Sequence, residues 1–337
     1  MQLRKTALSW LLGGISTLGL TGQVLAAQAE EAASPQEEIP LEERLDNYRS
    51  QLRELYEDYS QELEAYPFDY SDTQLEKRLQ QELRLDSNPF AFTPHQRNYL
   101  LPFSYTSDTN EEGFDAITQD ADLQPVEIKF QFSLKVPVMQ QWLSEEDSLH
   151  LAFTQTSWWQ AYHRDASRPF RESNYQPEIF YTHRSDLHFL GLQNNYNRLG
   201  IAHESNGRTN PQSRSWNYIY WSTALAKGRW MLEFSPRYKL PRITGEANNP
   251  DIEDYLGYFD LTLAYANWKQ EWVVTTQGNF ETEKGGLQLD WSFPILGRLR
   301  GLLQVYGGYG ESLVDYNHEN YRISLGIQFT NQLFGEN

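Results

Sequence analysis

Three hydrogen-bonding residues, His203, Ser205 and Asn217, carry the groups of an activated serine nucleophile. The Ser205 hydroxyl can attack an acyl carbon, the His203 imidazole can take its proton, and the Asn217 amide can hold the imidazole tautomer. A neutral amide suits a site on an apolar surface, because removing a carboxylate from water costs far more free energy. The residue types therefore predict an acyl-ester hydrolase with a Ser-His-Asn triad.

The positions of these residues strengthen the prediction. Side chains alternate between the two faces of a strand, so His203 and Ser205 share a face with Leu199 and Ile201. Asn217 likewise lies on an apolar row of the following segment. The loop between the two segments is short enough to make them antiparallel neighbours. A His-Ser pair two residues apart is common by chance, so its placement on an apolar face opposite a matching amide carries the argument.

The segments that position these residues have the period of β-strands. Apolar residues alternate without a miss over Val126–Val138, against a row that contains Glu127, Lys129 and Lys135. The same alternation predicts strands at Leu149–Trp158, Leu199–Ser205, Trp230–Tyr238, Tyr255–Tyr265, Leu287–Phe293 and Tyr321–Phe329.

Strands of about ten residues with aromatic ends and polar loops are typical of outer-membrane barrels. Residues 98–334 give about 12 strands at about 20 residues for each strand and its share of loop. We therefore predict an all-β fold, a 12-stranded antiparallel transmembrane β-barrel that is apolar outside, with Glu127, Lys129 and Lys135 paired in the lumen. An even number of strands puts both termini in the periplasm.

The composition excludes several classes of function. The 337 residues carry 28 Lys and Arg against 46 Asp and Glu, a formal net charge of −18. This balance argues against nucleic acid as a partner, because phosphate binding needs clustered Lys and Arg. The chain has no Cys, which removes disulfides, thiolate zinc sites and cysteine nucleophiles.

The N-terminal part divides into two predicted regions. Residues 1–26 have the basic start, the short apolar stretch Ala7–Leu20 and the small final residues of a secretory signal peptide. Residues 27–97 form an acidic periplasmic extension with short amphipathic helices. One helix is predicted over Leu45–Tyr59 and a second over Leu75–Leu83. The extension is either a solvated spacer or a docking arm that contacts a periplasmic partner through residues 41–85.

Several sequence blocks also resemble one known family. They are Asn88-Pro89-Phe90, Ser157-Trp158-Trp159-Gln160, Pro169-Phe170-Arg171-Glu172, His203-Glu204-Ser205-Asn206-Gly207-Arg208, Ser213-Arg214-Ser215-Trp216-Asn217 and Tyr309-Gly310-Glu311-Ser312-Leu313. In this order they resemble the outer-membrane phospholipase A family of Gram-negative bacteria. The resemblance implies a barrel domain over residues 98–337 that hydrolyses phospholipid and lysophospholipid acyl esters at the outer leaflet.

The resemblance also implies the roles of particular residues. His203, Ser205 and Asn217 fall on the family's catalytic triad, and Gly207 falls where a backbone N–H binds the oxyanion. The family uses calcium and is active as a homodimer. The implied calcium ligands are the Arg208 carbonyl, the Ser213 hydroxyl and Ser167 from the partner subunit. Gln155 is a polar residue on an apolar row. It either lies at the level of the lipid head groups or, as the resemblance implies, forms a hydrogen bond across the dimer interface.

Two other readings remain open at this point. A non-catalytic outer-membrane barrel, acting as a small pore or adhesion scaffold, would keep the fold without the chemistry. A soluble secreted esterase on a β-sandwich would keep the chemistry on another fold, although its outward faces would be polar.

Overall fold

The computed structural model describes two units of the chain, residues 1–69 and residues 70–337. The described residues are 47, 50, 73–86, 92–111, 122–164, 168–241, 248–267, 269–297, 299–331 and 333. The predicted signal peptide lies outside them, and so does the predicted helix Leu45–Tyr59 apart from Asn47 and Ser50. The second unit contains the architecture that follows.

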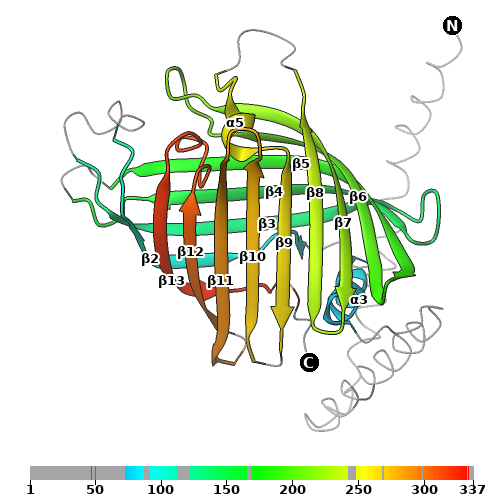
Figure 1. The fold of residues 1–337 in the computed structure, drawn as a ribbon. Helices are drawn as coiled ribbons and strands as arrows, with labels where there is room; N and C mark the ends of the chain where they lie inside the picture. The colour runs from blue at the N-terminus through cyan, green and yellow to red at the C-terminus, as the bar shows by residue number, and fades with distance from the viewer. Residues whose placement is uncertain are drawn as a thin grey trace, which may run out of the picture. The chain divides into compact units, whose positions relative to one another are not determined.

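Twelve antiparallel strands form a closed barrel in the second unit (Figure 1). Each strand pairs with the next one along the chain, and β13 pairs with β2 to complete the ring. A two-residue strand, β1 (Thr93–Pro94), adds to β3. The barrel strands are β2 Tyr99–Thr106, β3 Val126–Gln140, β4 Asp147–Trp159, β5 Phe170–Phe189, β6 Leu192–Ser205, β7 Ser215–Lys227, β8 Trp230–Lys239, β9 Phe259–Ala266, β10 Glu271–Asn279, β11 Lys284–Leu296, β12 Leu299–Gly308 and β13 Asn320–Gln328.

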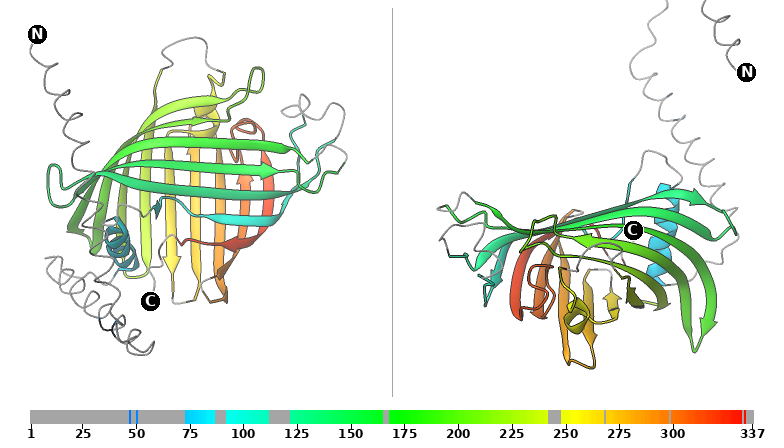
Figure 2. Two further views of the ribbon diagram at one scale, coloured as in Figure 1. Left: turned by 180° about the vertical axis from the view of Figure 1, so that it is seen from behind. Right: turned by 90° about the horizontal axis from the view of Figure 1, so that it is seen from above.

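The two faces of the wall have the chemistry that the alternation predicts. On β3, Glu127 and Lys129 are buried inside the barrel, whereas Phe132 and Val138 are about half exposed on the outside. Figure 2 shows the same wall from behind and from above. The outer row continues around the barrel through exposed apolar side chains, among them Leu151, Ile179, Leu199, Ile201, Trp221, Leu263, Ile323 and Leu325.

Paired charges line the lumen. Glu127 accepts bonds from Arg171 and from Arg322, whose Nη1 lies 2.7 Å from the Glu127 Oε1. The Lys129 ammonium lies 3.0 Å from a carboxylate oxygen of Glu311. The predicted pairing of the inward charges is confirmed, and their bonds join segments that are far apart in the sequence.

Helix α3 (Gln74–Asp86) packs against the barrel at one end, and it confirms the helix predicted over Leu75–Leu83. Leu75 is buried in a cluster with Ala224 and Met231. The carboxylate of Glu82 lies 2.6 Å from the Lys135 ammonium. No helix in the described part of the chain is long and apolar enough to cross a membrane.

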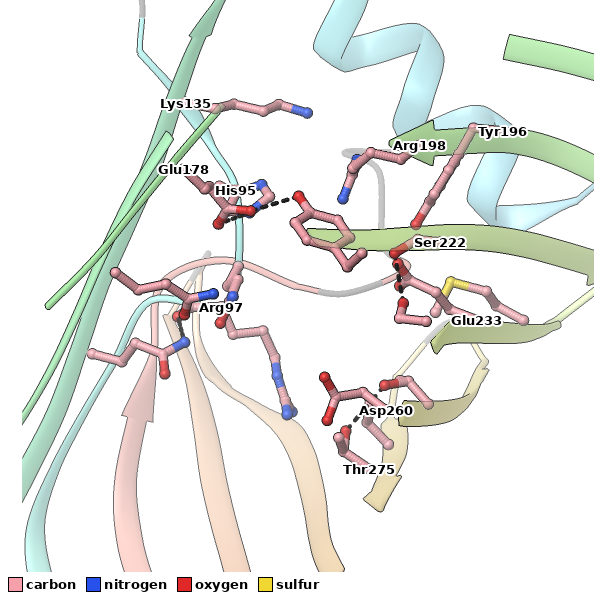
Figure 3. Close-up of a pocket in the computed structure, with 18 of the residues that line it drawn as sticks. His95, Arg97, Lys135, Glu178, Tyr196, Arg198, Ser222, Glu233, Asp260 and Thr275 are labelled. Carbon is pink, nitrogen blue, oxygen red and sulfur yellow. Dashed lines mark hydrogen bonds and ion pairs between the residues drawn. The ribbon is translucent and has the colours of Figure 1, made fainter. Parts of the chain in front are cut away.

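A polar cavity of about 390 Å³ lies in the lumen beside α3 (Figure 3). His95 and Glu178 meet at 2.8 Å on one side of it, and the Tyr220 hydroxyl donates to the second Glu178 oxygen at 2.6 Å. The Ser222 and Ser235 hydroxyls share a hydrogen bond of 2.6 Å on another side. These lining groups are themselves hydrogen-bonded.

The strand predicted at Tyr255–Tyr265 is wrong at its start. Residues Ile252–Leu256 form the short helix α5, and β9 begins at Phe259. Both ends of α5 are buried, and Gly257 then turns the chain at a φ of +67°. A Cβ at Gly257 would lie 1.6 Å from the carbonyl oxygen of Gly278, so this junction admits only glycine. The aromatic residues alternate across the end of α5 as they would in a strand, and this pattern led to the wrong start for β9.

Candidate active site

The β6–β7 hairpin brings the predicted catalytic residues together on the outer wall. In its register His203 lies opposite Asn217, and Ser205 lies opposite Ser215. Leu199 and Ile201, which precede His203 on the same row, are each about half exposed. The polar side chains therefore stand on the apolar outer face, as the alternation predicts.

His203 and Asn217 form a hydrogen bond. The His203 Nδ1 and the Asn217 Oδ1 are 2.8 Å apart. An amide oxygen only accepts hydrogen bonds, so the proton of the neutral imidazole is on Nδ1 and the lone pair is on Nε2. Asn217 therefore holds His203 in the tautomer that can accept a proton, and Ser205 follows two residues later on the same face.

A row of residues crosses the outer wall at the level of Ser205. The register places Gln155 of β4 opposite Tyr175 of β5, and Tyr175 opposite Ser205 of β6. Gln155 and Ser205 are thus two strand spacings apart, about 10 Å. The Gln155 amide donates to the Ser157 hydroxyl at 3.0 Å, and that hydroxyl bonds the Ser173 hydroxyl at 2.8 Å.

The loop after Ser205 is organised by Asn206. The Asn206 Oδ1 accepts from the backbone N–H groups of Arg208 and Arg214, at 3.3 and 2.9 Å. Its Nδ2 donates to the Gln212 carbonyl at 2.9 Å. Gly207 stands at the turn with a φ of +66°, where a side chain would be strained. The loop therefore has a defined backbone immediately after Ser205.

The predicted calcium ligands lie in this loop. The Arg208 side chain bends inward and donates to Glu172 at 3.0 Å, so its carbonyl is the group left for a cation. The Ser213 hydroxyl accepts from the Asn248 amide at 2.6 Å. Ser167 lies outside the described residues.

The chemistry of these ligands fits calcium. Carbonyl and hydroxyl oxygens are the hard donors that calcium prefers. Within the described ranges, no group of three or more His, Cys, Asp or Glu side chains could hold a metal ion. The Arg208 carbonyl and the Ser213 hydroxyl would therefore bind a cation through neutral oxygens.

Comparison with known proteins identifies the family. The family model for phospholipase A1 matches residues 75–329. This chain belongs to the phospholipase A1 family. Among curated members, phospholipase A1 of Escherichia coli (strain K12) is 38% identical over 253 residues, which cover 75% of this chain and 86% of that protein. Phospholipase A1 of Klebsiella pneumoniae is 38% identical over 250 residues, covering 73% and 85%.

Solved phospholipase structures share the fold. The outer membrane phospholipase dimer of Salmonella typhi with bound calcium aligns with a TM-score of 0.70 at 36% identity, covering 73% of this chain and 94% of that one. Outer membrane phospholipase A from Escherichia coli aligns with a TM-score of 0.69 at 36% identity, covering 72% and 100%. The match to the phospholipase A1 family model begins within α3, so the acidic residues before α3 lie outside the matched region.

Sequence reasoning missed two residues of this site. Tyr175 lies between Gln155 and Ser205, and its ring is 3.5 Å from the position of a Cβ built on Gly207. Period-two alternation extended over β5 would have put Tyr175 on the outer row. Glu172 is fully buried behind the loop, and the sequence block that contains it gave no sign that it bonds Arg208.

Proposed function

We propose that this protein is a calcium-dependent phospholipase of the outer membrane that hydrolyses phospholipid and lysophospholipid acyl esters with Ser205 as nucleophile. The observation that carries the proposal is the His203–Asn217 hydrogen bond on the apolar outer face, two residues from Ser205. Family membership supports the reaction class. A solved Escherichia coli relative is described as an asparagine-to-alanine active-site mutant, which agrees with a catalytic amide.

The reaction begins with the Ser205 hydroxyl. Its Oγ forms a bond to the acyl carbon while its proton passes to the Nε2 of His203. Asn217 accepts from Nδ1 throughout and keeps the ring in place. The tetrahedral intermediate then collapses, the ester C–O bond breaks, and His203 returns the proton to the departing alkoxide.

Water completes the cycle. His203 takes a proton from water, and the hydroxide attacks the acyl carbon. The bond from that carbon to the Ser205 Oγ then breaks, His203 returns the proton to Oγ, and the fatty acid leaves. The Gly207 N–H would bind the oxyanion in both steps. Arg208 and Ser213, with the partner's Ser167, would hold calcium, which supplies positive charge near the developing oxyanion when it is bound.

A homodimer accounts for the row across the outer wall. Gln155 is about 10 Å from Ser205, and polar side chains join membrane spans by bonding across an interface. A second copy packed on this row would form an apolar cleft beside Ser205 that receives an acyl chain. The calcium-bound dimer of the Salmonella typhi relative supports this arrangement.

We also propose the organisation of the whole chain. Residues 1–26 direct export, and residues 27–97 precede the barrel on its periplasmic side, where α3 and residues 93–97 pack against it, because an even number of strands leaves both ends of the barrel on one side. Residues 98–337 form the catalytic domain. The side of the barrel that carries the β6–β7 loop then faces the outer leaflet, where the phospholipid substrate is met.

Acyl release by the purified, detergent-solubilised protein tests the proposal. Wild type, Ser205→Ala and the lumen control Ser222→Ala are compared with calcium and with a chelator. We expect calcium-dependent release by wild type and Ser222→Ala, and a loss on the order of 10⁴-fold or more in Ser205→Ala. Equal activity in wild type and Ser205→Ala would overturn the assignment of Ser205 as nucleophile. No acyl release by wild type in any condition would leave the non-catalytic barrel, although the ion-paired lumen argues against an open pore.

A further inference from the structure

One side chain ties the loop after Ser205 to the inside of the barrel. The Arg208 guanidinium donates through Nε to Glu172 at 3.0 Å, and through Nη1 to the Gln212 side chain at 3.2 Å. Its Nη2 donates to the carbonyls of Phe170 and Arg171 on β5. Four acceptors on two segments thus fix the direction of this side chain, and the Arg208 carbonyl belongs to the same residue.

Glu172 is a rigid anchor for that side chain. Its carboxylate is fully buried, and its other oxygen accepts from the Asn174 amide at 2.7 Å. The Asn174 Oδ1 accepts in turn from the Leu313 N–H at 3.0 Å. The neighbouring Arg171 is held by Asp315 at 2.6 Å. Arg208 is therefore fastened to a fixed network of the inner wall.

We infer that Glu172 is a positioning residue for the calcium site, because its ion pair with Arg208 fixes the Arg208 carbonyl and the Gly207 N–H beside Ser205. This inference rests on the proposed function. It explains why a residue that offers only its backbone to the cation is an arginine. A planar guanidinium bonds several acceptors at once, whereas a lysine ammonium is a point charge on a flexible stem.

The expected effect is on calcium binding. Partners that orient metal ligands typically contribute about 10-fold to 100-fold to metal affinity. Glu172→Gln keeps the shape of the side chain but leaves the guanidinium without its anion, so we expect a calcium dissociation constant about 10-fold higher or more. Arg208→Lys keeps the positive charge and the backbone carbonyl, and we expect a loss of the same order.

Calcium titration calorimetry on the full-length protein in detergent measures this effect. The matched control is Asp290→Asn, which removes the carboxylate of another buried pair, 2.5 Å from Arg97, away from the loop. Heat-modifiable electrophoretic migration verifies that each variant is folded. Hydrogen exchange without calcium gives a second readout, and the Arg208 and Arg214 amides are expected to exchange faster in Glu172→Gln.

The outcomes distinguish failure of this inference from failure of the proposed phospholipase function. Weaker calcium binding in both Glu172→Gln and Arg208→Lys, with Asp290→Asn near wild type, supports the positioning role. Wild-type calcium affinity in Arg208→Lys, or equal losses in Glu172→Gln and Asp290→Asn, overturns it while calcium-dependent hydrolysis by wild type stands. A wild type that neither binds calcium nor hydrolyses phospholipid overturns both.

Discussion

The inner and outer faces of the β6–β7 hairpin carry different kinds of polar side chain. Inside, the carboxylate of Glu204 accepts from the Trp216 indole at 2.9 Å, within a lumen rich in ion pairs. Outside, the polar groups are a hydroxyl, an imidazole and an amide, joined by the His203–Asn217 bond. Charge is kept inside, where other charges neutralise it, whereas the proposed triad on the outer face contains no carboxylate.

This difference has an energetic meaning. Breaking a buried ion pair leaves an uncompensated charge, so the inner groups contribute mainly to stability. Removing a neutral group from the outer surface leaves no unpaired buried charge, so we expect the proposed triad to contribute mainly to activity. The comparison predicts that substitutions on the two faces affect different measurements.

The largest expected effect is on the outer face. His203→Ala removes the only proposed base, and we expect turnover to fall roughly 10⁴-fold to 10⁶-fold. The free energy of unfolding in urea should change little. Acyl release at saturating calcium, with Ser222→Ala as the control, measures the fall. A loss smaller than tenfold would contradict the role of His203.

The next effect is on the inner face. Glu127→Gln leaves Arg171 and Arg322 without their shared carboxylate, both within the buried part of the lumen. We expect a loss of about 3–5 kcal/mol in the free energy of unfolding. Urea titration followed by Trp fluorescence checks it. A change below about 1 kcal/mol would show that the inner network does not carry stability.

Two substitutions of Asn217 test whether the orientation of the His203 imidazole matters for turnover. Asn217→Ala removes the acceptor for His203 Nδ1, and we expect turnover to fall about 10²-fold, because the base loses its preferred tautomer. Asn217→Asp restores an acceptor, so its activity should exceed that of the alanine variant. Matched assays of the three proteins decide the point. If Asn217→Ala keeps wild-type turnover, the 2.8 Å bond has no catalytic role.

A smaller effect is expected where α3 docks. Burial alone would raise the pKa of Glu82, but the adjacent Lys135 and Arg78 outweigh this effect and lower the pKa from 4.5 to about 2. The ionised Glu82 thus stabilises docking fully above pH 4.5, and this contribution is lost as the pH falls through 4.5 to 2. Glu82→Gln should lower the free energy of opening of residues 74–86 at pH 7 by about 1–2 kcal/mol, so that their amides exchange faster. Exchange that matches wild type would contradict it, while acyl release is expected to stay unchanged.

The smallest effect concerns the dimer. Gln155→Ala removes one hydrogen-bonding side chain from the outer row, and single bonds between spans are worth about 0.6–1.7 kcal/mol. We expect the dimer dissociation constant with calcium to rise about threefold to twentyfold. Analytical ultracentrifugation in detergent measures it. A dimer of unchanged strength would place the interface elsewhere on the wall.

Much of the fold could be predicted from the sequence, because alternation reports which face each residue occupies. The strand around Val126–Val138, the inward pairing of Lys129 and the outward row of His203 all follow from period two. The start of β9 does not follow from this alternation. The helix before it depends on the close contact between Gly257 and Gly278, which are 21 positions apart.

The site was less predictable where it depends on long-range register. The sequence gives the spacing of His203 and Ser205 within one strand, but the row from Gln155 through Tyr175 to Ser205 needs the register of three strands. Likewise, the Arg208 side chain could point to solvent or inward. The choice depends on Glu172, 36 positions earlier, and on the network behind it.

Labelling with a serine-directed fluorophosphonate tests the central claim most directly, since it asks which hydroxyl is activated. The detergent-solubilised wild type is labelled with calcium present, and the modified residue is mapped by mass spectrometry beside His203→Ala and Ser205→Ala. We predict about one label per chain on Ser205, a much slower reaction in His203→Ala and none in Ser205→Ala. Label on another serine, or label on Ser205 at equal rates with and without His203, would contradict an activated nucleophile on the outer wall.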